Sequence, residues 1–206
     1  MGSADNLTAE RPSPGPGRPR NEELDELILE TVRELVVEMG YQALSVQEVV
    51  RQCNVHVRTI TRRWPSKAEL VTAAISGGDE EPSPALGATG NLRADLRSVV
   101  EGALDYMSQP ATRVAMPALM AEMRTNAHVA ARFHRRQADL RATVHTILEA
   151  AVQSGDAPKT VIRARRLLPN MITGSAFSVQ FMDADPPKDP LIDELTDLLL
   201  AAALGA

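Results

Sequence analysis

The fold is decided by residues 45–70, which read SVQEVVRQCNVHVRTITRRWPSKAEL. Ser45 and Glu48 have the spacing of a capping box, in which two side chains satisfy two free backbone amides at a helix N-terminus. The predicted helix ends near Cys53, because Asn54 tolerates the left-handed backbone that a tight turn requires. This stretch therefore begins with a short helix and a turn.

Two more helices are predicted after the turn. A short helix covers about 56–63 and is ended by Pro65, which cannot continue it. Ser66 and Glu69 form a second capping box, which opens a helix that runs to about Ile75.

The segment from the turn to the second capping box is basic. It contains four cations and no acid: Arg58, Arg62, Arg63 and Lys67. Two helices joined by a turn of about three residues form a helix-turn-helix, whose second helix enters the major groove of DNA. An ordinary helical hairpin with a cationic surface fits the same pattern, so the pattern alone leaves both interpretations open.

Helical periodicity continues on both sides of this segment. Upstream, apolar residues at spacings of three and four predict a helix over 21–39 that ends at Gly40. Downstream, helices are predicted over 92–107, 111–125, 126–154, 158–182 and 191–203, after a linker at 76–90. No stretch alternates as a strand does, so the expected fold class is all-α.

The expected organisation has three parts. Residues 1–20 are rich in proline and glycine and lack spaced apolar residues, which predicts a disordered basic arm. Residues 21–75 are expected to form a helix-turn-helix domain, and residues 91–206 a helical-bundle domain.

Charge and cysteine content exclude several classes of protein. The 206 residues include 22 Lys+Arg and 27 Asp+Glu, a formal net charge of −5. Bulk positive charge therefore cannot bind nucleic acid, and any DNA contact needs a locally basic surface, since salt screens charges beyond about 8–10 Å. The single cysteine, Cys53, excludes an intramolecular disulfide and a zinc–cysteine cluster, and leaves open whether its thiol is redox-active.

We expect a cytoplasmic protein. No apolar run approaches the roughly 18–20 residues that span a bilayer, so no membrane contact is predicted. The N-terminus also lacks the apolar stretch of a signal peptide.

Residues 54–70 resemble the recognition segment of TetR-type transcriptional repressors. The run RRWPSK at 62–67, of an actinobacterial type, is the most specific part, and Gly40-Tyr41, Leu44-Ser45-Val46 and Val49 also match the family. The resemblance covers about 21–75. It implies a dimeric, sequence-specific DNA-binding regulator with no cofactor, whose residues 91–206 bind an effector and dimerise.

The resemblance also implies DNA contacts. It places Thr59 near DNA and Lys67 where a helix N-terminus can hold a phosphate. Arg58 and Arg62 lie one turn apart, so either can read a guanine. The predicted DNA-binding set is Arg18, Arg20, Ser45, His56, Val57, Arg58, Thr59, Thr61, Arg62, Arg63 and Lys67.

Three features of this set are less typical. His56 stands where the family has a small polar residue, and Thr61 where it has a tyrosine that bonds the DNA backbone. Arg18 and Arg20 suit a minor-groove arm, although a solvated tail explains them as well.

A small-molecule pocket is implied among residues 92–182, with dimerisation through the last two helices. Methionines suit irregular apolar or amphipathic ligands, and the prolines Pro117 and Pro169 would kink helices and open space, although core packing is the simpler explanation at any one position. The predicted ligand-binding set is Met107, Met116, Leu119, Met120, Met123, Phe133, Val144, Met171 and Phe177. Polar candidates are Glu122, His145, Asn170 and Gln180.

Two other classes of protein compete with a regulator. An enzyme or a metal site is disfavoured, since the histidines lack HExxH spacing and the chain lacks a Gly-rich phosphate loop and a G-x-S-x-G elbow. The second alternative is a helical small-molecule-binding or protein-interaction module without DNA activity. This alternative does not explain why residues 54–67 contain four cations and no acid. We therefore favour a regulator, a repressor released by its ligand, whose partners are double-stranded operator DNA, a small-molecule effector and a second copy of the chain.

Overall fold

The computed structural model describes residues 22–77, 88–182 and 188–205. Within these ranges the chain forms helices and no strand, which confirms the all-α prediction. The helices are α1 Glu22–Ala43, α2 Val46–Cys53, α3 Val57–Thr61, α4 Lys67–Ile75, α5 Leu92–Ser108, α6 Pro110–Glu122, α7 Ala127–Ser154, the 3₁₀ helix η1 Lys159–Arg166, α8 Leu168–Met182 and α9 Lys188–Leu204.

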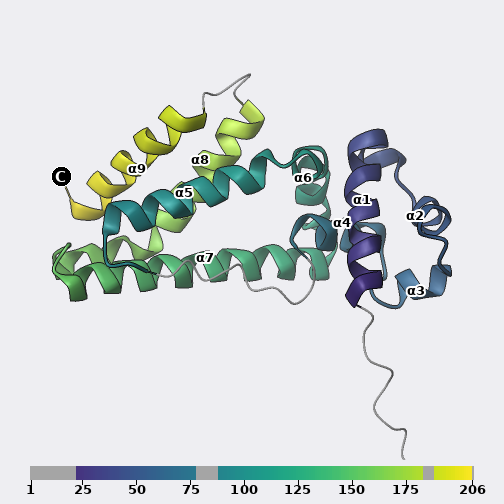
Figure 1. Cartoon of the computed structure of the whole chain (residues 1–206), viewed down its shortest axis with the longest axis horizontal. Coiled ribbons are helices and arrows are strands. Elements are labelled where there is room, and N and C mark those ends of the chain that lie inside the picture. Colours follow the sequence, from purple (N-terminus) through teal and green to yellow (C-terminus); the bar gives the residue numbers. More distant parts are fainter. Residues whose placement is uncertain (1–21, 78–87, 183–187, 206) are drawn as a thin grey trace, which may run out of the picture.

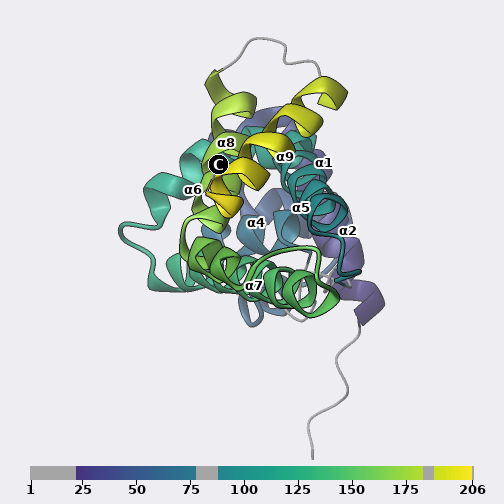
Figure 2. The ribbon, with the colours of Figure 1, turned by 90° about the vertical axis from the view of Figure 1, so that its left-hand side faces the viewer.

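The helices form two groups along the long axis of the molecule. Figure 1 shows α1, α2 and α3 at one end, α5, α8 and α9 toward the other, and α4 and α6 between them. The long helix α7 runs beneath α5 and reaches α4 and α6. Seen from the α9 end, α5, α8 and α9 lie above α7 (Figure 2).

Serine caps begin α2 and α4, as the sequence predicts. Ser45 Oγ accepts a hydrogen bond from Glu48 N at 3.2 Å, and Ser66 Oγ accepts one from Glu69 N at 3.1 Å. The glutamates do not complete the expected reciprocal boxes. The Glu48 carboxylate pairs with Arg51, and the Glu69 carboxylate accepts a hydrogen bond from the Ser66 hydroxyl.

Residues with positive φ mark the predicted turns. Asn54 ends α2 in the left-handed conformation, at φ 51° and ψ 47°. Gly40 interrupts α1 at φ 82° and ψ 159°, so regular helix ends there as predicted and a further turn, to Ala43, follows the break.

Two predicted helices differ from the structure. The helix predicted over 56–63 is only the five-residue α3, and the preceding His56 forms no side-chain capping bond. The helix predicted over 158–182 is divided into η1 and α8. Pro169 lies in the first turn of α8, where its missing N–H has no helical partner to lose, so it does not kink a helix interior. Pro117 does lie inside α6.

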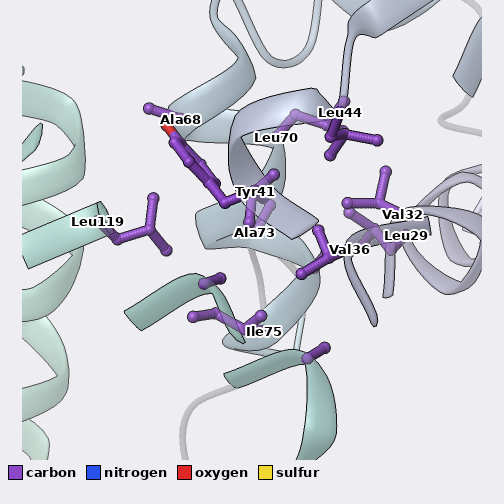
Figure 3. Close-up of a cluster of buried hydrophobic side chains, with 14 of the residues drawn as sticks. Leu29, Val32, Val36, Tyr41, Leu44, Ala68, Leu70, Ala73, Ile75 and Leu119 are labelled. Carbon is purple, nitrogen blue, oxygen red and sulfur yellow. The ribbon is translucent and has the colours of Figure 1, made fainter. Parts of the chain in front are cut away.

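Buried apolar side chains form two clusters. The first joins α1, α2, α3 and α4 to α6 and the start of α7, and Figure 3 shows Val32, Val36, Ala73, Ile75 and Leu119 within it. The second joins α5, α7, α8 and α9. The helix-turn-helix thus shares its core with helices that follow residue 75, and the domain limits 21–75 and 91–206 stay a prediction.

Helix α4 is the most enclosed element of the first cluster. Seven of its nine residues are buried, and it contacts α1, α6 and α7. One of the seven is polar: Thr72, whose hydroxyl donates to Ala68 O at 2.6 Å. Because neighbours surround α4, it cannot move without displacing them.

Removal of the α4 cap tests its local energetics. Ser66→Ala is expected to lower the free energy of unfolding by about 1 kcal/mol, because Glu69 N loses its acceptor. Ser66→Gly is the control and is expected to cost only a few tenths of a kcal/mol. Urea unfolding followed by circular dichroism measures both, and equal losses would contradict the capping role.

Candidate DNA-binding surface and effector cavity

Helix α3 presents a cationic face to solvent. Ile60 is fully buried and fixes the rotation of the helix against α2. Val57, Arg58 and Thr61 of α3 and the following Arg62 are exposed. Neither Arg58 nor Arg62 forms an ion pair within the described parts of the chain, so both guanidinium groups are available to an external acceptor.

Arg63 has an internal partner instead. Its Nε lies 2.8 Å from Asp25 Oδ1 of α1, and the two side chains are only 14% and 22% exposed. Although the sequence predicts a DNA contact for Arg63, the structure places its guanidinium in the contact between α1 and the helix-turn-helix.

Lys67 is also engaged within the chain. Its Nζ donates to Tyr41 O at 2.9 Å and to Gln42 O at 3.2 Å, and it lies 4.5 Å from the centre of the Tyr41 ring. These carbonyls belong to the turn that ends α1, where a cation complements the partial negative charge of a helix C-terminus. The ammonium that the sequence assigns to a phosphate therefore ties α4 to α1.

The other predicted DNA-binding residues lie at or beside the exposed face. His56 is exposed and Thr59 is half-buried. Ser45 is exposed at the start of α2, with its hydroxyl oxygen used as a cap. Arg18 and Arg20 fall outside the described residues.

A cavity of about 990 Å³ lies beside the C-terminal end of α4. Residues of α5, α6, α7 and α8 form most of its wall, and the segment Ala74–Gly77 closes the side toward α1. Its apolar lining includes six residues of the predicted ligand set: Met107, Met116, Met120, Met123, Phe133 and Phe177.

The remaining predicted ligand residues do not line this cavity. Leu119 is fully buried in the first core cluster and Val144 in the second. Met171 is 40% exposed on the surface of α8. None of the polar candidates lines the cavity: Glu122 accepts from Tyr41, His145 lies 3.3 Å from Glu149, Asn170 accepts from Gln137, and no contact places Gln180 there.

Sequence reasoning missed the polar and the small lining residues. Gly102 and Ala103 leave room on α5, and Tyr106 and Arg136 bring polar groups to the wall. In the sequence, Tyr106 and Arg136 are surrounded by ordinary charged and apolar residues and belong to no motif that marks a ligand site. Only the packing of α5 against α7 brings the two together, so no sequence signal marks them.

The wall also includes Arg33 of α1. Its Nη1 donates to Ala74 O at 2.7 Å, and its guanidinium pairs with Glu26 and Glu30. Arg33 thus joins the cavity, the last turn of α4 and helix α1.

Hydrogen bonds join the last turn of α1 and the N-terminal end of α4 to the later helices. Tyr41 Oη donates to Glu122 Oε1 of α6 at 3.3 Å. Burial and the adjacent Glu122 carboxylate raise the pKa of Tyr41 to about 12. Asn126, which caps α7, donates from Nδ2 to Ser66 Oγ at 3.3 Å and to Glu69 Oε1 at 3.4 Å. The α4 cap is therefore bonded directly to the α7 cap.

Two further kinds of site are absent from the described part of the chain. No helix there combines the length and apolarity needed to cross a membrane. No group of three or more histidine, cysteine, aspartate or glutamate side chains in those residues is arranged to hold a metal ion.

A helix-turn-helix with two outward arginines, joined to a helical bundle with a cavity, defines a helix-turn-helix transcriptional regulator. The description "Bacterial regulatory proteins, tetR family" matches residues 28–74, and "Tetracyclin repressor-like, C-terminal domain" matches residues 86–199. The chain belongs to the TetR family of bacterial transcriptional regulators. The members of that family that it matches are regulators rather than enzymes.

Relatives and solved structures agree with this assignment. An uncharacterised helix-turn-helix transcriptional regulator of Mycobacterium tuberculosis is 31% identical over 198 residues, 95% of this chain and 94% of the relative. The DNA-binding transcriptional repressor TetR of Mycobacteroides abscessus is 28% identical over 120 residues, 58% of this chain and 63% of the relative. A TetR transcription regulator from Haloarcula marismortui has a similar fold, with a TM-score of 0.68 at 15% identity, over 89% of this chain and 97% of that one.

The raised pKa of Tyr41 predicts a pH-dependent difference in stability between the wild type and Tyr41→Phe. Between the ordinary value of 10.0 and about 12, the unfolded phenol loses its proton and the folded phenol keeps it. The contribution of the hydroxyl is therefore complete below pH 10 and is lost as the pH rises toward 12. Urea unfolding of both proteins at a series of pH values measures this difference. Parallel stability curves over that range would contradict it.

Proposed function

We propose that the protein is a dimeric repressor that binds operator DNA through α3 and is released when a small apolar or amphipathic ligand enters the cavity. One observation carries this proposal: the enclosed helix α4 borders the cavity at its C-terminal end and is bonded to α1 and α7 at its N-terminal end. The relative in Mycobacteroides abscessus whose name is that of a DNA-binding repressor supports the direction of the control.

DNA recognition rests on the exposed face of α3. Arg58 and Arg62 read base edges or phosphates in the major groove, and Val57 lies where a thymine methyl group can be contacted. Ser45, His56, Thr59 and Thr61 contact the DNA backbone beside them, with Thr61 reaching it through water. Arg18 and Arg20 act as a minor-groove arm, and the RRWPSK run is of an actinobacterial type.

Dimerisation uses the outer faces of α8 and α9. Large apolar side chains stand exposed on these helices and beside them: Leu167, Met171, Met182, Leu198 and Leu204. Two copies related by a two-fold axis cover these faces in a four-helix interface. The pair of α3 helices then reads two half-sites about 34–36 Å apart, or a multiple of that distance.

Release follows from a shift between two arrangements of the dimer. A ligand changes operator affinity only if it binds one arrangement better than the other. The wall formed by Ala74–Gly77 gives the ligand a direct contact with α4. Lys67 joins α4 to α1, and Arg63, which follows α3, is paired with Asp25 of α1. A displacement of α4 is therefore passed through α1 to α3.

The double variant Arg58→Glu/Arg62→Glu tests DNA binding. We expect affinity for DNA from upstream of its own gene to fall at least about thirtyfold, since each of the two arginine contacts with a guanine contributes roughly 1–3 kcal/mol. Fluorescence anisotropy of a labelled duplex over a salt series measures the loss.

Arg163→Glu/Arg165→Glu is the matched control. Both side chains are exposed on η1, at the far end of α7 from α3, and the change in net charge is the same. The control is expected to bind the upstream DNA as the wild type does, and both proteins should bind a random duplex weakly. An equal loss of binding in both variants would contradict recognition by α3.

Leu198→Glu tests the dimer. Leu198 is 65% exposed on α9 of a single chain, so the change leaves the fold intact and places two carboxylates in the proposed interface. We expect sedimentation to show a monomer whose operator binding is weakened. Val37→Glu, at a 48% exposed position of α1, is the control and should stay dimeric. A dimeric Leu198→Glu protein would rule out this interface.

A further inference from the structure

One cation of the cavity wall, Arg136, has no compensating acid among the described residues. Three basic side chains line it, Arg33, His134 and Arg136, and no aspartate or glutamate of the described residues does. Arg33 is neutralised by Glu26 and Glu30 outside the cavity. Arg136 has neither an ion pair nor a hydrogen bond with a described residue, and its guanidinium carbon lies 3.6 Å from the centre of the Tyr106 ring.

The Tyr106 hydroxyl is a second polar group without a partner at this wall. The residue is only 8% exposed, and its Oη forms no hydrogen bond with the described part of the chain. Burial raises the pKa of Tyr106 above its ordinary value, while the nearby Arg136 and Arg132 charges favour the ionised form. The adjacent Ser76 hydroxyl donates to Thr72 O at 2.6 Å rather than to the phenol. The phenol therefore stays protonated at neutral pH and can donate to an acceptor. A buried donor without an acceptor is destabilising, so a ligand that supplies one gains affinity.

We propose that the effector is an amphipathic organic anion, whose acidic headgroup binds Arg136 and Tyr106 and whose apolar body fills the methionine- and phenylalanine-lined part of the cavity. The inference rests on the proposed function, because it takes this cavity as the effector site. A carboxylate accepts charge-assisted hydrogen bonds from a guanidinium and from a phenol at once.

The rest of the cavity suits a large apolar body. Its volume of about 990 Å³ lies at the upper end of the range for small-molecule sites, roughly 300–1,000 Å³. Met107, Met116, Met120 and Met123 provide a surface that adapts to irregular shapes. A quaternary ammonium headgroup finds no carboxylate in the described wall, so the site discriminates against cationic amphiphiles.

Three probes with the same decyl chain test the headgroup: decanoate, decanol and decyltrimethylammonium, each titrated calorimetrically into the DNA-free protein below its critical micelle concentration. Decanoate is expected to bind at least about tenfold more tightly than decanol, because hydrogen bonds to a charged group contribute more than that factor. Decyltrimethylammonium is expected to bind more weakly than decanol.

Variants of the two adjacent arginines of α7 assign the preference to one side chain. Arg136→Gln is expected to bring decanoate affinity down to that of decanol and to leave decanol affinity unchanged. Arg136→Lys keeps the charge and is expected to retain part of the preference, which separates charge from any effect on folding. Arg135→Gln is the matched control, since Arg135 is exposed and does not line the cavity.

The proposal is overturned if decanoate does not bind, if decanol or the cation binds as tightly, or if Arg136→Gln keeps the preference for decanoate. Operator release is measured separately, by anisotropy with the labelled upstream duplex. Selective binding of decanoate that leaves operator affinity unchanged would support this inference about the cavity and contradict release by a ligand. If decanol releases the operator and decanoate does not, release by a ligand is supported and the anionic headgroup is contradicted.

Discussion

The burial of α4 on every side is the constraint on which the rest of the structure depends. A helix of nine residues spans only about 13 Å, yet α4 contacts α1, α6 and α7, and seven of its residues are buried. Its N-terminal end holds the turn after Gly40 through Lys67, and its C-terminal end forms a wall of the cavity. Because protein cores are close-packed, we expect a displacement of one end of α4 to be transmitted to the other end.

Fixing the helix-turn-helix to α1 uses half of the cations in the basic segment. Arg63 is paired with Asp25 and Lys67 with the backbone carbonyls of Tyr41 and Gln42, so only Arg58 and Arg62 face outward. For a chain with a net charge of −5, this leaves a small cationic surface on each copy. In the proposed dimer two copies would double that surface, and the affinity for DNA would then depend on the spacing between the two α3 helices more than on either helix alone.

Local sequence signals predicted what local interactions determine. Ser45, Asn54 and Ser66 mark helix ends because each side chain or backbone conformation acts within four residues. Arg62 and Arg63 are chemically identical neighbours just after α3, and only the tertiary placement of this turn beside α1 leaves the first guanidinium exposed and pairs the second with Asp25. Likewise Met120 and Leu119 are adjacent apolar residues, but one lines the cavity and the other packs in the core. The cavity's polar groups, Tyr106 and Arg136, come from different helices, so their proximity is a tertiary property that no local pattern encodes.

Residues of both core clusters line the cavity, so the ligand that we propose would contact both. Ile75 and Met116 on its wall belong to the first cluster, and Val99 and Ala176 belong to the second. A ligand that changes the separation of these walls repacks the boundary and leaves both cores intact, which costs less than a deformation within either one. Such a displacement would reach α1 through Arg33, whose hydrogen bond to Ala74 O joins the last turn of α4 to α1. The free energy that couples ligand binding to DNA binding cannot exceed the difference in ligand affinity between the two arrangements of the walls. The polar contacts at Arg136 and Tyr106 contribute to this coupling only if their strength differs between the two arrangements.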